Sequence, residues 1–168
     1  MTYEELSRIV FESESSRKAS LGKISTDAHW AAVTGRLGHP ASDARSIREE
    51  FFAGDIVDTA LVDFIRSLRP RYKTGVISNA WPDLRDYLAE KQLDDAFDTL
   101  VISAEVGIMK PEPRIYQIAL DNLGVSAREA AFVDDTPPNV EAASALGMHG
   151  ILFREPVRAL RDLKEIMK

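Results

Sequence analysis

The sequence predicts an α/β protein with a parallel sheet, preceded by a segment that is all helical. From residue 55 onward, short apolar runs alternate with amphipathic helical patterns. These runs are continuously apolar, as expected for strands that are covered by helices on both faces. Strands that alternate with helices pair in parallel through right-handed crossovers. Residues 2–53, in contrast, show helical patterns alone.

Composition limits the classes of protein that need to be considered. The 168 residues are enough for one domain with a real core, and 45% hydrophobic with 29% charged residues is ordinary for a globular protein. The net charge of −6 argues against nucleic-acid binding. Without cysteine, neither disulfides nor thiolate metal sites can form. We see no signal peptide and no membrane span, so we expect a cytoplasmic protein without a membrane partner.

The N-terminal segment contains three helical patterns, each with a candidate cap at its start and a glycine at its end. The candidate caps are Thr2 with Glu5, then Ser25 or Thr26, then Ser42, and the glycines are Gly22, Gly38 and Gly54. His29 lies in the second pattern without a His or acidic partner at ligand spacing. We therefore interpret it as an ordinary surface or core histidine.

The second part of the chain alternates regularly between helix and strand, with turn or capping residues at the joints. The expected elements are a helix from Asp58 or Thr59 to Pro70, a strand ending at Ser78, a helix with Pro82 near its first turn, a strand over Thr99–Ser103, a helix ending at Gly124, one turn with a Ser126–Glu129 capping box, a strand over Ala130–Val133, a helix ending at Gly147, a strand over Gly150–Phe153, and a helix from Pro156.

The adjacent carboxylates Asp134 and Asp135 follow directly after an apolar strand. Open α/β sheets bind ligands at the carboxyl ends of their strands. Two neighbouring carboxylates repel each other, and a hard cation such as Mg²⁺, which takes oxygen ligands, would supply the counter-charge. The alternative is structural: Asp135 or Thr136 caps the next helix, with Pro137 in its first turn, while Asp134 is merely solvated.

Two further polar features follow earlier strands. The hydroxyl of Ser78 and the backbone N–H of Asn79 could hold a phosphate oxygen, or the serine could satisfy backbone groups at the strand end. Lys110, in MKPEP, could reach the same pocket as a point charge for phosphate, or it could be a solvated surface lysine. Together with the Asp pair, these residues indicate a site for phosphate and magnesium.

These motifs resemble the haloacid dehalogenase-like (HAD) superfamily, in the subgroup with a helical cap inserted early. The matching segments are GVISNA, GIMKPEPRIYQIAL and AAFVDDTPPNVEAASALG. The resemblance implies a Rossmann-like core, a cap over the site and Mg²⁺-dependent hydrolysis of phosphate esters. It implies that Ser78 and Asn79 bind phosphate, that Lys110 steadies the nucleophile and the phosphate, and that Asp134, helped by Asp135, holds Mg²⁺. Dehalogenases of the superfamily lack the Asp pair, which favours phosphatase ancestry.

The resemblance also implies a division into a helical cap segment, residues 1–54, and an α/β core, residues 55–168. We expect the Thr99–Ser103 strand outermost in the sheet, followed by the strand of Ser78, the strand of Asp134 and the Gly150–Phe153 strand. Residues 2–53 should pack over the carboxyl ends of these strands.

One family motif is not found. The family begins with a central strand that ends in Asp-x-Asp, whose first Asp is the covalent nucleophile. The nearest candidate, Asp55 and Asp58, has the wrong spacing and follows a helix. Without this strand a slot should remain between the strands of Ser78 and Asp134. Three outcomes are open: the two strands close up and pair directly, another segment or chain fills the slot, or the true protein is longer than this sequence. A second copy could supply that segment in a homodimer.

The expected function follows from these points. We expect a Mg²⁺-dependent phosphatase lineage that acts on a small phosphorylated metabolite, with the 168-residue chain itself poorly active because the nucleophile is missing. The alternative is a non-catalytic relative that binds phosphate and metal or regulates.

Overall fold

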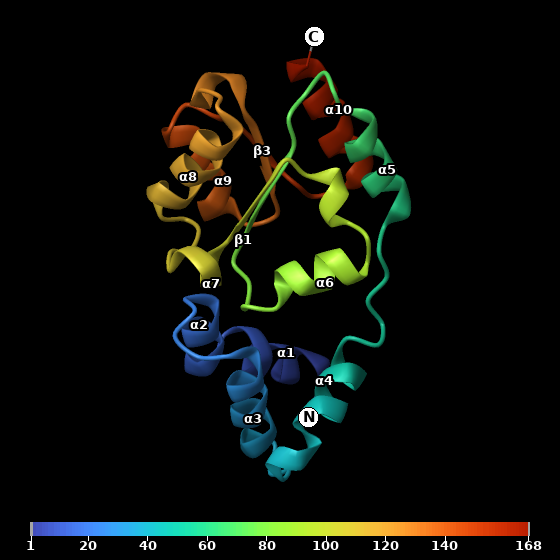
Figure 1. Ribbon diagram of the computed structural model, residues 1–168, viewed down its shortest axis with the longest axis vertical. Coiled ribbons are helices and arrows are strands. Elements are labelled where there is room, and N and C mark those ends of the chain that lie inside the picture. The colour runs from blue at the N-terminus through green and yellow to red at the C-terminus, as the bar shows by residue number, and fades with distance from the viewer. Residues whose placement is uncertain (1, 168) are drawn as a thin grey trace.

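The structure, a computed structural model, describes residues 2–167, so that Met1 and Lys168 lie outside it. The N-terminal helices gather at one end of the molecule, and the strands and remaining helices form the other part (Figure 1). The N-terminal elements are α1 (Tyr3–Phe11), α2 (Glu14–Ser20), α3 (Thr26–Arg36), the 3₁₀ turn η1 (Ala41–Asp43) and α4 (Ala44–Phe51). This segment is helical as predicted, although its limits as a cap stay a prediction.

Side-chain caps explain where these helices begin. The predicted capping box is confirmed: Thr2 Oγ1 accepts a hydrogen bond from the Glu5 amide, and Glu5 Oε2 accepts one from the Thr2 amide. Ser25, rather than Thr26, caps α3 by accepting from the amide of Ala28 at 3.1 Å.

Two expectations for this segment are wrong. The first pattern forms two helices, because Ser13 Oγ accepts from the Ser16 amide and starts α2 before Gly22 is reached. Ser42 does not cap the third helix: its hydroxyl donates to Asp43 Oδ1 within η1, and α4 begins after that turn. Serines close in sequence can therefore have different local roles, which depend on the backbone groups within reach.

The second part contains the alternating elements that the sequence predicts. They are α5 (Thr59–Ser67), β1 (Gly75–Ser78), α6 (Leu84–Glu90), η2 (Asp94–Ala96), β2 (Thr99–Ile102), α7 (Ser103–Val106), α8 (Pro113–Leu123), η3 (Ala127–Glu129), β3 (Ala131–Asp134), α9 (Pro137–Ala145), β4 (His149–Leu152) and α10 (Pro156–Ile166). Asp58 caps α5, and the Ser126–Glu129 capping box is confirmed. The boundaries differ at Ser103, which starts α7 instead of ending β2, and at Pro82, which precedes α6.

The four strands form two separate parallel pairs. β1 pairs with β2, which places Ser78 opposite Ile102, and β3 pairs with β4, which places Asp134 opposite Leu152. The parallel direction and the neighbours within each pair are as predicted. Within residues 2–167, β1 and β3 do not hydrogen-bond to each other, so the two strands have not closed up into one sheet. The single four-stranded sheet that was expected is therefore not formed within these residues, and a segment between β1 and β3 stays a prediction.

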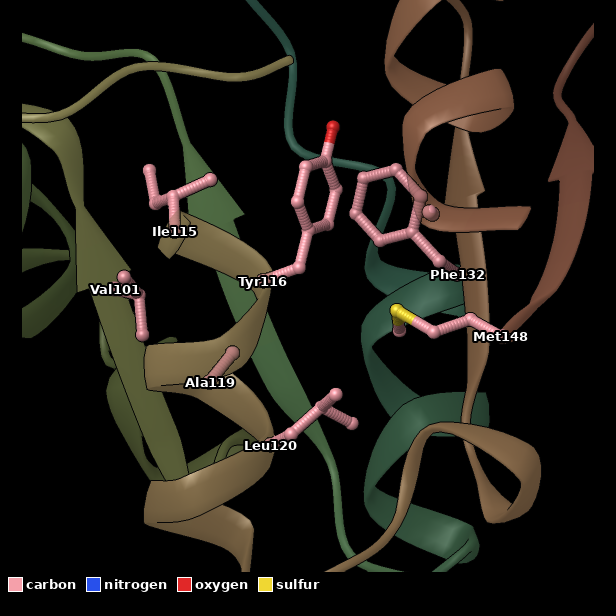
Figure 2. Packing of buried hydrophobic residues seen from close by; sticks show 8 residues of the cluster. Val101, Ile115, Tyr116, Ala119, Leu120, Phe132 and Met148 are labelled. Carbon is pink, nitrogen blue, oxygen red and sulfur yellow. The ribbon is translucent and has the colours of Figure 1, made fainter. Parts of the chain in front are cut away.

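Helix α8 and its hydrophobic cluster connect the two strand pairs. The buried members of this α/β cluster come from β2, α8, β3, α9 and the residue before β4: Val101, Ile115, Tyr116, Ala119, Leu120, Phe132, Ala143 and Met148. Figure 2 shows Tyr116 of α8 pointing toward Phe132 of β3, and their ring centroids are 5.1 Å apart with the rings nearly perpendicular. Side-chain packing therefore joins the pairs where backbone hydrogen bonds do not.

A second cluster lies in the helical segment. Its fully buried members are Val10, Trp30 and Val33, and Phe51, Phe52 and Trp81 pack against them. Trp81 comes from the loop after β1, so it links the two parts of the molecule. The segment also meets the start of α7, because Gly22 approaches the Ala104 carbonyl so closely that a Cβ would lie 2.1 Å from its oxygen. Since α7 follows β2 directly, the segment lies at the carboxyl ends of β1 and β2.

Candidate active site

Asp134, the last residue of β3, is the most constrained carboxylate at the strand ends. Its side chain is only 7% exposed. Oδ1 accepts hydrogen bonds from the Thr136 amide and from Asn139 Nδ2, both at 2.9 Å, and Oδ2 accepts one from Lys110 Nζ at 2.6 Å. Three donors and low exposure fix this carboxylate, so Asp134 is not the merely solvated residue of the structural alternative.

The charge state of Asp134 follows from these contacts. Burial by itself raises the pKa of the carboxyl, but hydrogen bonds from Lys110, Asn139 and the Thr136 amide, with the charge of Lys110, outweigh it and lower the pKa. Asp134 is therefore ionised at neutral pH and provides a negative charge at the end of β3.

Lys110 is also well covered, with 11% of its side chain exposed, so it is not a solvated surface lysine. Its ammonium group lies 5.5 Å from the centroid of the Phe132 ring, next to its partner Asp134. Its backbone is held by Asn79: the Lys110 amide donates to Asn79 Oδ1 at 2.7 Å, and Asn79 Nδ2 donates to the Lys110 carbonyl at 2.9 Å. These reciprocal bonds join the loop after β1 to the loop before α8.

The structure thus brings together Asn79, Lys110 and Asp134 through direct contacts. Ser78 ends β1, as Asp134 ends β3, but no hydrogen bond to its hydroxyl is found within residues 2–167. Asp135 is exposed, and its Oδ1 accepts from Thr136 Oγ1 at 3.1 Å. Thr136 sits at the N-cap position of α9, but its side chain does not cap the helix. The predicted roles of these residues in binding and catalysis stay predictions.

Several residues around this site were missed from sequence. Asn139, buried in the first turn of α9, orients Asp134, and its carbonyl accepts a hydrogen bond from Tyr116 Oη at 2.9 Å. Burial and the charge of Asp134 raise the pKa of Tyr116 to about 12, so the hydroxyl stays protonated and keeps donating. Ser103, fully buried, bonds both backbone groups of Ala80 through its hydroxyl. A polar residue on an otherwise apolar helix face was the one available signal for Asn139.

The oxygen donors at the strand ends fit Mg²⁺. A carboxylate offers about four lone-pair positions, of which three in Asp134 accept hydrogen bonds, and Asp135 adds an exposed carboxylate next to it. Within residues 2–167 no group of three or more His, Asp or Glu side chains forms a complete metal site. Mg²⁺ commonly binds through one or two carboxylates together with water and substrate phosphate.

No helix in residues 2–167 has the length and apolar content that crossing a membrane requires.

Comparison with known proteins identifies the family. The haloacid dehalogenase-like hydrolase family matches residues 13–147. The chain is 39% identical to bifunctional epoxide hydrolase 2 of Rattus norvegicus over 164 residues, covering 86% of this chain but 29% of that enzyme. It is 40% identical to phosphoserine phosphatase of Thermus thermophilus over 79 residues, covering 46% of this chain and 32% of that enzyme. The chain thus spans less than a third of the length of either relative.

A solved structure agrees with this assignment. A HAD family enzyme from Bacteroides thetaiotaomicron, in complex with magnesium and inorganic phosphate, superposes with a TM-score of 0.74 at 19% identity. The match covers 92% of this chain and 85% of that one, and at this identity it shows the fold alone. Because the family match covers most of the sequence, the chain belongs to the haloacid dehalogenase-like hydrolase family.

Proposed function

We propose that this site belongs to a Mg²⁺-dependent phosphatase that acts on a small phosphorylated metabolite. The observation that carries the proposal is the covered Lys110–Asp134 pair at the strand ends, with Nζ and Oδ2 2.6 Å apart. Two relatives support the reaction class: one is a phosphoserine phosphatase, and the other is a HAD family enzyme in complex with magnesium and inorganic phosphate. The acidic chain, at −6, does not favour a nucleic-acid substrate.

The proposed roles follow from the donors that each residue offers. The Ser78 hydroxyl and the backbone N–H of Asn79 hold phosphate oxygens, and the Lys110 ammonium neutralises phosphate charge while it steadies the attacking group. Asp134 and Asp135 hold Mg²⁺, which when bound stabilises charge on the phosphoryl oxygens. Asn139 and the Thr136 amide keep Asp134 oriented toward the site.

In this proposal, the 168-residue polypeptide by itself is a weak catalyst. The carboxylate that contacts Lys110 within the described chain is Asp134, and its oxygens are already committed to three donors and to the proposed cation. It is therefore a poor nucleophile. In a hydrolase that has lost its covalent nucleophile, positioning and electrostatics alone still accelerate the reaction about 10³–10⁴-fold over the rate in water.

A second candidate is a phosphate-binding and metal-binding module without catalysis. The observation that favours it is the same commitment of Asp134, together with the lack of pairing between β1 and β3 within residues 2–167. In this proposal a strand from a second copy of the chain lies between β1 and β3, which makes the protein a homodimer. The cytoplasmic location expected from the sequence suits either candidate.

Calorimetry and a phosphatase assay together test the proposal. Purified protein should bind inorganic phosphate in the presence of Mg²⁺, and Lys110→Met and Asp134→Asn should each weaken that binding at least tenfold. Asp63→Asn, at an exposed carboxylate on α5, is the matched control and should change nothing. Hydrolysis of an aryl phosphate should stay far below ordinary enzyme rates of about 1–10³ s⁻¹. If phosphate does not bind, both candidates fail, whereas rapid hydrolysis that depends on Lys110 would show that the nucleophile is misassigned.

A further inference from the structure

The loop between β1 and α6, residues 79–83, contacts both parts of the molecule. Its first residues belong to the candidate site: Asn79 bonds the backbone of Lys110, and both backbone groups of Ala80 bond the buried hydroxyl of Ser103. This end of the loop is therefore fixed by the α/β part, next to Ser78.

The middle of the loop enters the helical segment. The ring centroid of Trp81 lies 4.5 Å from that of His29 and 5.9 Å from those of Phe11 and Trp30. Its indole Nε1 donates to Ser16 Oγ at 3.3 Å. Together with Phe52, four neighbouring aromatic rings and one hydrogen bond hold this side chain, so a shift of the helices would displace the loop.

Asp83, the last residue of the loop, is held by two helices of that segment. Oδ1 accepts a hydrogen bond from Thr26 Oγ1 at 2.8 Å, where Thr26 is the first residue of α3. Oδ2 accepts a charge-assisted bond from the guanidinium of Arg48 on α4. The side chains of Arg48 and Asp83 are 36% and 31% exposed, so solvent screens this pair less than a fully exposed one.

We propose that Asp83 is a positioning residue, which fastens α3 and α4 to the loop that carries Asn79 and thereby sets the affinity of the site for phosphate. Asp83 contacts none of the predicted site residues within the described chain. It acts through four residues of backbone whose other end is fixed by Ser103 and Lys110. This inference rests on the proposed function, because it takes phosphate binding at Ser78 and Asn79 as its readout.

The test measures the affinity of the full chain for inorganic phosphate with Mg²⁺ by titration calorimetry. Asp83→Asn and Arg48→Met should each weaken binding about fivefold or more, the lower range of coupling between linked sites. The double variant should be no weaker than the worse single one, because both changes break the same contact. Arg45→Met, on the same helix, breaks an exposed pair with Glu49 instead and should leave the affinity unchanged.

The measurement is made well below the unfolding midpoint of every variant, where a loss of stability alone leaves the folded fraction and hence the affinity unaltered. Unchanged affinity in Arg48→Met would overturn the proposal even if Asp83→Asn fails to fold. Where all variants fold, additive losses in the double variant would also overturn it. If the unchanged protein itself binds no phosphate, the proposed function has failed, and this inference fails with it.

Discussion

The two hydrophobic clusters of the molecule differ in how completely their buried polar atoms are hydrogen-bonded. In the α/β cluster and the site beside it, Tyr116, Asn139 and Ser103 all make hydrogen bonds. In the helical segment, His29 Nε2 and Trp30 Nε1 are buried and have no hydrogen-bond partner of ordinary geometry among residues 2–167. An unsatisfied buried donor or acceptor typically costs about 1–3 kcal/mol. Full satisfaction therefore coincides with the region that holds the candidate site.

The two clusters should also differ in the kind of substitution that destabilises them most. The helical cluster relies on large aromatic rings, with Phe51, Phe52 and Trp81 around Trp30. The α/β cluster is mainly aliphatic, and the polar contacts beside it are specific. We therefore expect volume changes to be most damaging in the helical segment, and single hydroxyl deletions to be most damaging around the site.

Trp30→Ala should have the largest effect. Its side chain is 1% exposed, and truncation leaves a cavity among aromatic rings, so the free energy of unfolding should fall by about 3–5 kcal/mol. Urea unfolding followed by circular dichroism measures this, with the slope m unchanged. Tyr3→Ala, at an aromatic ring that is 71% exposed, is the control and should cost far less. Equal losses in the two variants would contradict the assignment of Trp30 to a core.

Ser103→Ala should cost about 1–3 kcal/mol, because it leaves the Ala80 backbone groups without their hydroxyl partner. The same urea titration applies. Ser42→Ala, which removes an exposed hydroxyl in the helical segment, should change the free energy of unfolding by no more than about 0.5 kcal/mol. A neutral Ser103→Ala would mean that water replaces the hydroxyl and that the loop is less constrained than its contacts indicate.

Tyr116→Phe should reduce the free energy of unfolding by about 0.5–1.5 kcal/mol, the net value of one hydrogen bond, here the one to the Asn139 carbonyl. Spectrophotometric titration provides a second measurement. In the unchanged protein, Tyr116 should contribute its tyrosinate absorbance only near its pKa of about 12, and this late step should be absent from Tyr116→Phe. Tyr87→Phe, at a half-exposed ring on α6, serves as the control for both measurements.

The pH dependence of stability should show the effect of burying His29. Burial lowers its pKa from the ordinary 6.5, and the backbone of Val10 offsets only part of that change. The unfolded chain therefore takes up a proton before the folded protein does. Stability is complete above pH 6.5 and declines as the pH falls toward the folded pKa, by at most about 1.4 kcal/mol per pH unit for one proton.

Urea titrations between pH 8 and pH 5 measure this decline as the difference between the unchanged protein and His29→Gln. His39→Gln, at an exposed histidine, should retain the decline. A difference that is flat across this range would show that His29 is protonated as readily in the folded protein as in the unfolded chain.

Local signals in the sequence predicted most of the helices and strands, and they placed Ser78 and Asp134 at strand ends. The Thr2–Glu5 and Ser126–Glu129 capping boxes form because all of their partners lie within three residues. The alternation of apolar runs with helices determines parallel pairing, which places the ends of β1 and β3 where Ser78 and Asp134 are found. These features depend on neighbours in the chain, so no knowledge of distant contacts is needed.

Long-range contacts decided the rest, because their partners are far apart in sequence. Asn79 and Lys110 are 31 positions apart, so no local pattern reveals their reciprocal bonds, and the same holds for Ser103 with Ala80. The packing of the distant Trp81 against His29 is likewise invisible in the local sequence. Likewise, side-chain packing around α8 joins the two strand pairs, and this packing combines residues from several distant elements.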